Sequence, residues 1–186
     1  MTFIHYGGKF YRLVHPRPTV IIGTLCEDGR VNLMPASWNM PISEEPETIG
    51  VSVYKETFTY RCLKFHPYAT INVPGPELLD LTYSLGSVSG KDVDKVKKFN
   101  VELVESEKIN VPGMAKAIAI YETRIYNQID VGECTLFVFE VLKSKVRDGI
   151  TNQSGLDLRK TNLLLHGSGK IFHYVDKSML SARELE

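Results

Sequence analysis

The stretch Thr19-Val20-Ile21-Ile22-Gly23-Thr24-Leu25-Cys26-Glu27-Asp28-Gly29-Arg30-Val31 decides the fold of this chain. Its first seven residues are rich in β-branched side chains, which predicts a buried strand over Thr19–Leu25. The Asp28-Gly29 pair that follows tolerates positive φ and is typical of a hairpin turn. The sequence therefore predicts an antiparallel hairpin whose return strand runs from Val31 to about Trp38.

Further short strands are predicted along the rest of the chain, interrupted by only a few short helices. The strands are expected over Thr48–Val53, Tyr68–Val73, Val101–Glu105, Ala115 to about Gln128, Cys134 to about Arg147, and Ile171–Val175. Thr57 offers an N-cap for a first helix, which His66-Pro67 should end because proline disfavours α geometry in the residue before it. Two more short helices are predicted over Glu77–Leu85 and Asp92–Phe99.

The order of these elements favours a mainly β fold. Strands that are adjacent in sequence and joined by tight turns indicate an antiparallel barrel rather than a doubly wound parallel sheet. The segment around Pro41 and Pro46 is expected to be a loop, and the polar stretch Arg147–Gly169 is expected to be a long loop that covers a site or packs on a partner chain. Residues 1–186 are interpreted as a single domain.

Composition excludes several classes of protein. The 22 Lys and Arg residues cancel the 22 Asp and Glu residues, so no net charge draws the chain to nucleic acid or to anionic lipid. No apolar run approaches the roughly 18–20 residues that span a bilayer, and no signal peptide is visible, which favours a cytoplasmic protein. Cys26, Cys62 and Cys134 lie far apart without a C-x-x-C motif, so we expect reduced thiols rather than a disulfide framework or a zinc site.

Two nucleotide-binding motifs fail on inspection. Gly86-Ser87-Val88-Ser89-Gly90-Lys91-Asp92 is one residue too short for a P-loop, and Asp92 stands where the magnesium-binding Ser or Thr should be. No G-x-G-x-x-G occurs, so the fingerprint of a Rossmann dinucleotide site is absent. The five histidines show no metal-ligand spacing, and no metal site is predicted.

A composite series of segments remains after these exclusions. It comprises His15-Pro16-Arg17-Pro18-Thr19, the first hairpin, Pro35-Ala36-Ser37-Trp38-Asn39, Ser52-Val53-Tyr54-Lys55-Glu56-Thr57-Phe58-Thr59, Ile71-Asn72-Val73, Ser89 with Asp94 and Lys95, and Val131-Gly132-Glu133-Cys134. In this order the segments resemble the flavin reductase-like, FMN-binding split-barrel family, which includes flavoredoxin-type proteins. The resemblance covers roughly residues 10–175 and implies an antiparallel split barrel that forms a homodimer, with flavin at the subunit interface.

The resemblance also implies which residues bind FMN. They are Pro35, Ala36, Ser37, Trp38, Asn39, Ser52, Val53, Tyr54, Lys55, Thr57, Thr59, Ser89 and Lys95. Ser52, Lys55, Thr57 and Thr59 supply the donors that a phosphate needs, and the N-terminus of the helix after Thr57 favours an anion. As alternatives, Thr57 would be only a cap, Lys55 a solvated charge, and Trp38 a core or interface aromatic.

The implied reaction is hydride transfer from NADH or NADPH to FMN, followed by electron delivery to an acceptor. No side chain need act as a nucleophile or as an acid or base, because hydride transfer depends on stacking geometry. Many family members carry Gly-Asp-His where this chain has Gly132-Glu133-Cys134, and a thiol does not replace an imidazole as a donor or acid. A non-enzymatic FMN-bound electron carrier with a redox protein partner therefore stays as an alternative, as does a flavinless binding module.

Overall fold

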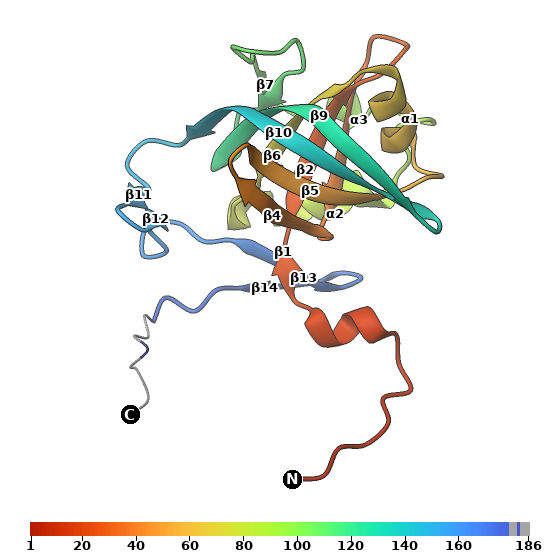
Figure 1. Ribbon diagram of the computed structural model, residues 1–186. Coiled ribbons are helices and arrows are strands. Elements are labelled where there is room, and N and C mark those ends of the chain that lie inside the picture. The colour runs from red at the N-terminus through yellow and green to blue at the C-terminus, as the bar shows by residue number, and fades with distance from the viewer. Residues whose placement is uncertain (179–181, 183–186) are drawn as a thin grey trace.

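The computed structural model describes residues 1–178 and 182, and it is dominated by antiparallel strands (Figure 1). The helical elements are η1 (Phe10–Val14), α1 (Phe58–Phe65), η2 (Pro76–Leu78), α2 (Leu79–Ser87) and α3 (Lys95–Lys98). The strands are β1 (Arg17–Pro18), β2 (Val20–Leu25), β3 (Val31–Ala36), β4 (Asn39–Glu44), β5 (Glu47–Tyr54), β6 (Tyr68–Val73), β7 (Leu103–Val104), β8 (Gly113–Met114), β9 (Ala119–Val131), β10 (Cys134–Val146), β11 (Thr151–Asn152), β12 (Gly155–Leu156), β13 (Leu164–Ser168) and β14 (Ile171–Tyr174).

The main sheet has seven strands in the order β3-β2-β6-β9-β10-β5-β4, and every neighbouring pair is antiparallel. β3 and β4 are the two edges of this sheet, yet only Ser37 and Trp38 separate them in sequence. Two residues span only about 10 Å, so the sheet must curl until its edges meet at this point. This geometry confirms the predicted antiparallel split barrel.

A hydrophobic core lies on each side of the curled sheet, because successive strand residues point to opposite faces. On β2, Val20 and Ile22 belong to one core cluster with Phe137 and Phe139, whereas Ile21 belongs to a second cluster with Leu33, Leu78, Leu85 and Met114. The second cluster packs α2 against β3. This packing places the end of α2 and the loop that follows it beside the free edge of β3.

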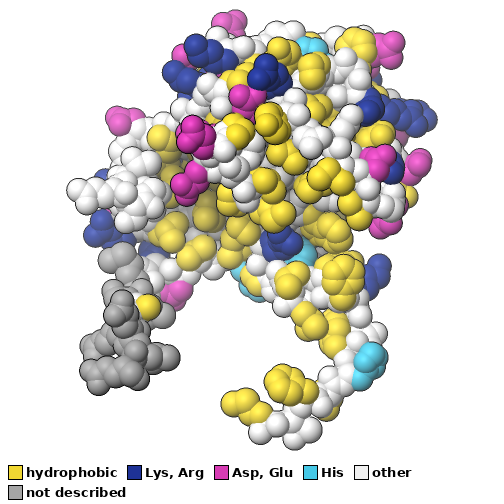
Figure 2. Space-filling model, in the orientation of Figure 1, with side chains coloured by type: hydrophobic (Ala, Val, Ile, Leu, Met, Phe, Trp, Pro, Cys, Tyr) yellow, Lys and Arg dark blue, Asp and Glu magenta, His cyan; other side chains and the backbone are white. Residues whose placement is uncertain are grey.

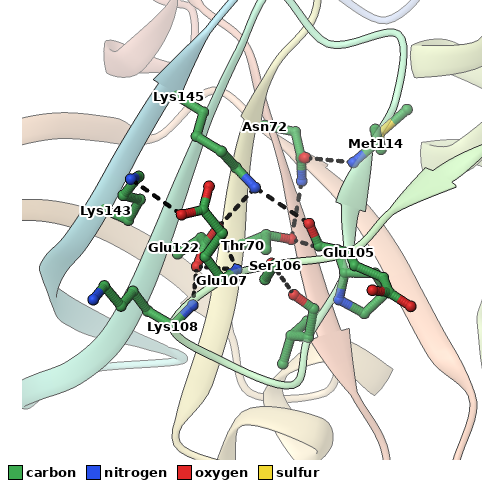
Figure 3. A network of polar contacts seen from close by, with 12 residues as sticks. Thr70, Asn72, Glu105, Ser106, Glu107, Lys108, Met114, Glu122, Lys143 and Lys145 are labelled. Carbon is green, nitrogen blue, oxygen red and sulfur yellow. Dashed lines mark hydrogen bonds and ion pairs between the residues drawn. The ribbon is translucent and has the colours of Figure 1, made fainter.

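A buried polar network fixes the loop between β7 and β8 to the long β9–β10 ribbon (Figure 3). The fully buried carboxylate of Glu122 accepts hydrogen bonds from the backbone N–H groups of Glu107 and Lys108 and pairs with Lys145 Nζ at 2.8 Å. Although burial acts to raise it, hydrogen bonds from Lys145 and from the two backbone N–H groups hold the pKa of Glu122 below its ordinary value. The network is structural, and it lies outside the two cavities of the candidate site described below.

Two segments expected as loops contain strands. The segment with Pro41 forms β4, which pairs with β5; proline is tolerated there because β4 is an edge strand. β13 forms within the expected loop Arg147–Gly169 and pairs with β14 and β1, as a small sheet below the barrel in Figure 1. The helix expected over Asp92–Phe99 is shorter, since it begins after the N-cap Asp94 and covers Lys95–Lys98.

The expectation of three reduced thiols is wrong for two of the cysteines. Cys26, in the turn after β2, and Cys62, in α1, form a disulfide with their Cα atoms 4.4 Å apart. The two residues are 36 positions apart in sequence, and only the packing of α1 on the first hairpin brings them together. Cys134 is free and half-buried at the start of β10.

Within the described residues, no helix has the length and apolar character needed to cross a membrane.

Candidate functional site

The free edge of β3 forms one wall of a groove made of two neighbouring cavities. The first, here called the helix-end cavity, has a volume of about 340 Å³ and lies between β3, the start of α1 and the loop after α2. The second, here called the outer cavity, has a volume of about 330 Å³ and continues along the end of β3 to the β13–β14 sheet. Gly86 and Ser87 line both cavities, so the two adjoin, and together they are here called the β3 groove.

Four residues predicted from the sequence lie together in the helix-end cavity, namely Thr57, Thr59, Ser89 and Lys95. Thr57 caps α1 by accepting a hydrogen bond from the backbone N–H of Tyr60, and its own hydroxyl donates to the carbonyl of Tyr54 at 2.8 Å. The Thr57 hydroxyl therefore already accepts one hydrogen bond and donates another. The first backbone N–H groups of α1 have no acceptor within the helix, and they make this end of the cavity favourable for an anion.

Lys95 places a buried positive charge in the helix-end cavity. Its side chain is 5% exposed, and its Nζ donates to the carbonyl oxygens of Leu33 at 2.9 Å and Leu85 at 2.7 Å. Burial lowers the pKa of the Lys95 ammonium from 10.5 to about 8. Among the described residues no carboxylate lies within ion-pair distance of this ammonium, so one of its three donors stays available for a ligand.

Asn32, on β3, is a residue of this cavity that the sequence analysis missed. It is 3% exposed, and its Nδ2 donates to the hydroxyl of Thr59 at 2.8 Å. Its Oδ1 is buried without a hydrogen-bond partner among the described residues. Because an amide can be turned over, with Thr59 then donating to the oxygen, Asn32 is able to offer an NH₂ donor to a ligand.

Glycine keeps the helix-end cavity open. A Cβ atom at Gly90 would collide with Asn32 Oδ1 and would lie 2.8 Å from the ring of Phe58. Any larger residue at position 90 would therefore push into the polar wall of the cavity. The loop Gly86–Asp92 does not match a P-loop, but its residues Gly86–Gly90 line the helix-end cavity.

The outer cavity is lined by apolar side chains and by several residues with hydroxyl groups. Three predicted residues, Pro35, Ala36 and Ser37, line it together with Phe172 and Gly169 from the β13–β14 sheet. Thr19 and Thr82 also line it, and their hydroxyls are buried without a hydrogen-bond partner among residues 1–178 and 182. Unsatisfied hydroxyls beside a cavity with apolar lining favour a ligand that carries both apolar surface and hydrogen-bonding atoms.

His166 also reaches the outer cavity, although the sequence analysis assigned it no role. Its Nδ1 lies 3.3 Å from the hydroxyl of Ser37, and its ring centroid is 5.0 Å from that of Phe172. β13 positions the imidazole here because β13 pairs with β1 in register with Arg17 opposite His166. Sequence spacing gave no signal, since residues 37 and 166 are 129 positions apart.

The remaining predicted residues lie outside the β3 groove. Trp38 is 41% exposed and packs edge-on against Tyr11, and Asn39 lines a separate apolar hollow. Val53 is buried in the core, and Lys55 donates to the carbonyl of Gly132 at 3.0 Å and pairs with Asp130. Ser52 and Tyr54 face Leu136 and Cys134 across the β5–β10 pair. The role of these residues toward a flavin stays a prediction.

Comparison with known proteins adds independent findings. The flavin reductase like domain family matches residues 10–172. An uncharacterized protein of Pyrococcus abyssi is 31% identical over 162 residues, covering 87% of this chain and 92% of that protein.

Two solved structures share the whole fold. Flavoredoxin of Desulfovibrio vulgaris (Miyazaki F) superposes with a TM-score of 0.86 at 25% identity, covering 97% of both chains. An FMN-binding protein from Thermus thermophilus superposes with a TM-score of 0.85 at 24% identity, covering 98% of this chain and 100% of the other.

Proposed function

This chain belongs to the flavin reductase-like domain family, and from that premise we propose that it binds FMN along the β3 groove. The phosphate would occupy the helix-end cavity, and the ring would occupy the outer cavity. Pro35, Ala36 and Ser37 would contact the ring, while Thr57, Thr59, Ser89, Lys95 and Asn32 would surround the phosphate.

One observation carries this proposal. The buried ammonium of Lys95 lines the same cavity as the unpaired amide oxygen of Asn32, and the first turn of α1 adds its free N–H groups. An isolated buried charge is unfavourable unless something pairs with it. A phosphate with about two negative charges would compensate the ammonium, and it would accept a hydrogen bond from the turned-over Asn32 amide, whose oxygen then accepts from the Thr59 hydroxyl. The exposed carboxylate of Glu56 lies at the rim and opposes an anion only weakly.

The outer cavity suits a flat heterocycle. Pro35, Ala36 and Phe172 offer apolar surface, and the hydroxyls of Thr19, Thr82 and Ser37 offer hydrogen bonds to ring heteroatoms. His166, held against Ser37, adds a nitrogen on the same side. These groups would orient the ring and exclude water from one of its faces.

We further propose that the protein is an NAD(P)H:FMN oxidoreductase. FMN, when bound, supplies the chemistry of accepting a hydride and passing electrons on. The contribution of this chain is to bind and orient, and no side chain of the β3 groove is assigned a nucleophilic or acid–base role. The alternative is an FMN-bound electron carrier, which Cys134 favours because it stands where the resembling reductases carry histidine.

We propose that two copies of the chain form a homodimer through a broad apolar hollow. This hollow, of about 970 Å³, is lined by β4, by the ends of β9 and β10, and by the β11–β12 segment. Hydrophobic side chains gather over the barrel face shown in Figure 2 and continue along the N-terminal segment, where Phe3, Phe10 and Leu13 are exposed. An apolar surface of this extent is typical of an interface between subunits.

The cytoplasm is proposed as the location. A disulfide such as Cys26–Cys62 is uncommon in a reducing compartment, so trapping of free thiols in lysed cells tests this part of the proposal.

The absorption spectrum of the purified protein and an FMN titration of the flavin-free protein test the binding proposal. Stopped-flow mixing of the FMN-loaded protein with NADH, and separately with NADPH, then tests the reaction. Loss of the visible flavin band within seconds supports the oxidoreductase. A flavin that only dithionite or a ferredoxin-like donor reduces supports the carrier, and a colourless protein that does not bind FMN refutes both.

A further inference from the structure

The Cys26–Cys62 disulfide stands beside the wall of the helix-end cavity. Cys62 lies one helical turn after Phe58, and Phe58 lines both the helix-end cavity and a neighbouring cavity of about 350 Å³. That neighbouring cavity, here called the disulfide cavity, is lined by Cys26, Glu27, Asp28, Phe58, Arg61, Cys62 and Phe65. Both cysteines are 2% exposed, and both line this cavity, which gives a route to the disulfide.

The disulfide is a covalent link between α1 and the first hairpin. Two further side-chain contacts join them, namely the hydrogen bond from Asn32 Nδ2 to Thr59 Oγ1 at 2.8 Å and the Arg30 guanidinium over the Phe58 ring, 6.0 Å from its centroid. Asn32 follows Cys26 on the hairpin, and Thr59 precedes Cys62 by less than one helical turn. The covalent link therefore helps to fix the first backbone N–H groups of α1 relative to the Asn32 side chain on β3, which lie on opposite sides of the helix-end cavity.

α1 depends on such a link more than a longer helix would. It has eight residues, and helices of this length are marginal without tertiary contacts. Reduction would leave two buried thiols in nearly the same volume, so the core would persist. What would be lost is the covalent constraint between α1 and the turn after β2, which leaves the Asn32–Thr59 hydrogen bond and the packing of Leu63 to hold the helix in place.

We propose that Cys26–Cys62 is a redox-modifiable site that sets the affinity of the helix-end cavity for the FMN phosphate, tight as the disulfide and weak as the dithiol. This inference rests on the proposed function. The reductant would be a small dithiol. One of its thiolates attacks a protein sulfur to give a mixed disulfide, and its second thiol then closes the oxidised reductant and releases the protein thiol. The protein gains two electrons and two protons, and the reductant loses the same.

The test measures FMN affinity in both redox states. The dissociation constant is obtained from quenching of FMN fluorescence for the untreated protein, for the protein treated with dithiothreitol, and for the Cys26→Ser/Cys62→Ser double variant. Titration of thiols under denaturing conditions confirms the states, with one thiol expected before reduction and three after it. Cys134→Ser is the matched control and should keep both the tight binding and its sensitivity to dithiothreitol.

We expect reduction to weaken FMN binding about tenfold, which corresponds to the loss of one charge-assisted hydrogen bond. Riboflavin, which has no phosphate, should bind equally well in both states. Circular dichroism checks that the reduced protein and the double variant stay folded. If the variant does not fold, the reduced wild-type protein still decides the question. Equal FMN affinity of the oxidised and reduced proteins overturns the inference.

A second measurement separates this inference from the proposed function. Amide hydrogen exchange over residues 58–65, measured without flavin, should become faster on reduction. Unchanged exchange together with equal FMN affinity in both states refutes the redox control and leaves FMN binding standing. Absence of FMN binding in both states refutes the proposed function and this inference together.

Discussion

Replacement of Lys95 by methionine gives the sharpest test of the proposed phosphate site. Methionine keeps most of the side-chain length but removes the charge and the donors to the Leu33 and Leu85 carbonyls. Loss of one charge-assisted hydrogen bond to a phosphate is worth about 1.5–3 kcal/mol. Lys95→Met should therefore raise the dissociation constant for FMN by about 10- to 150-fold. Lys98→Met, at an exposed position of the same short helix, is the matched control.

The free protein should also show the cost of burying this ammonium. A pKa of about 8 instead of 10.5 corresponds to about 3 kcal/mol of unfavourable free energy at neutral pH. Because the folded pKa is lowered, the folded state binds fewer protons than the unfolded state between these values. The unfolding free energy of the flavin-free protein should therefore rise between about pH 8 and pH 10.5, and this rise should be absent in Lys95→Met.

Fluorescence titrations with FMN and with riboflavin separate the phosphate from the ring. Lys95→Met should weaken FMN binding and leave riboflavin binding nearly unchanged. Calorimetry at pH 8.5 (roughly the range in which Lys95 is partly neutral) should show proton uptake when FMN binds to the wild-type protein. Unchanged FMN affinity in Lys95→Met, or an equal loss of riboflavin affinity, would show that the phosphate lies elsewhere.

Three further changes test separate parts of the structure. Gly90→Ala should weaken FMN binding at least about fivefold in the same titration, because its methyl group meets Asn32 and Phe58; an unchanged constant would place the ligand outside the helix-end cavity. Glu122→Gln should lower the unfolding free energy in urea at pH 7 by about 2–3 kcal/mol. Since the pKa of Glu122 is lowered, its contribution is lost as the pH falls through that value, so the variant should lose less stability in acid than the wild type; equal pH profiles would contradict this. Cys134→His should raise turnover with NADH or NADPH, measured under steady-state conditions, if position 134 meets the nicotinamide.

The barrel could be predicted from the sequence because its signals are local. The β-branched run and the Asp28-Gly29 turn specify a strand and its hairpin within a dozen residues. The bounds of β2 and β3 agree closely with the two strands predicted from them. β4 was missed because Pro41 reads as a strand breaker, a rule that does not hold at a sheet edge. β13 pairs with its neighbour β14 and with the distant β1, and it was missed because it ends a polar, glycine-bearing stretch that is typical of a loop.

The site was predictable only where its residues lie close together in sequence. Thr57 and Thr59 share a helix start, and Pro35, Ala36 and Ser37 share a strand end, so each group reaches one cavity as a unit. Asn32 gave no signal, since a single amide inside an otherwise apolar strand reads as an interruption. The Cys26–Cys62 pair and the contact of His166 with Ser37 depend on packing between distant elements, which no spacing rule expresses.

The position of the β9–β10 hairpin decides how the two candidate functions can be separated. Lys55 is tied to this hairpin through its hydrogen bond to Gly132, and Cys134 begins the second strand of the same hairpin. Neither residue lines the β3 groove of its own chain. An effect of Cys134→His on nicotinamide turnover would therefore require the hairpin to reach the groove of a second copy, so it should disappear when the protein is diluted to the monomer. If turnover is unaffected at every protein concentration, the hairpin takes no part in hydride transfer and the electron carrier becomes the better description.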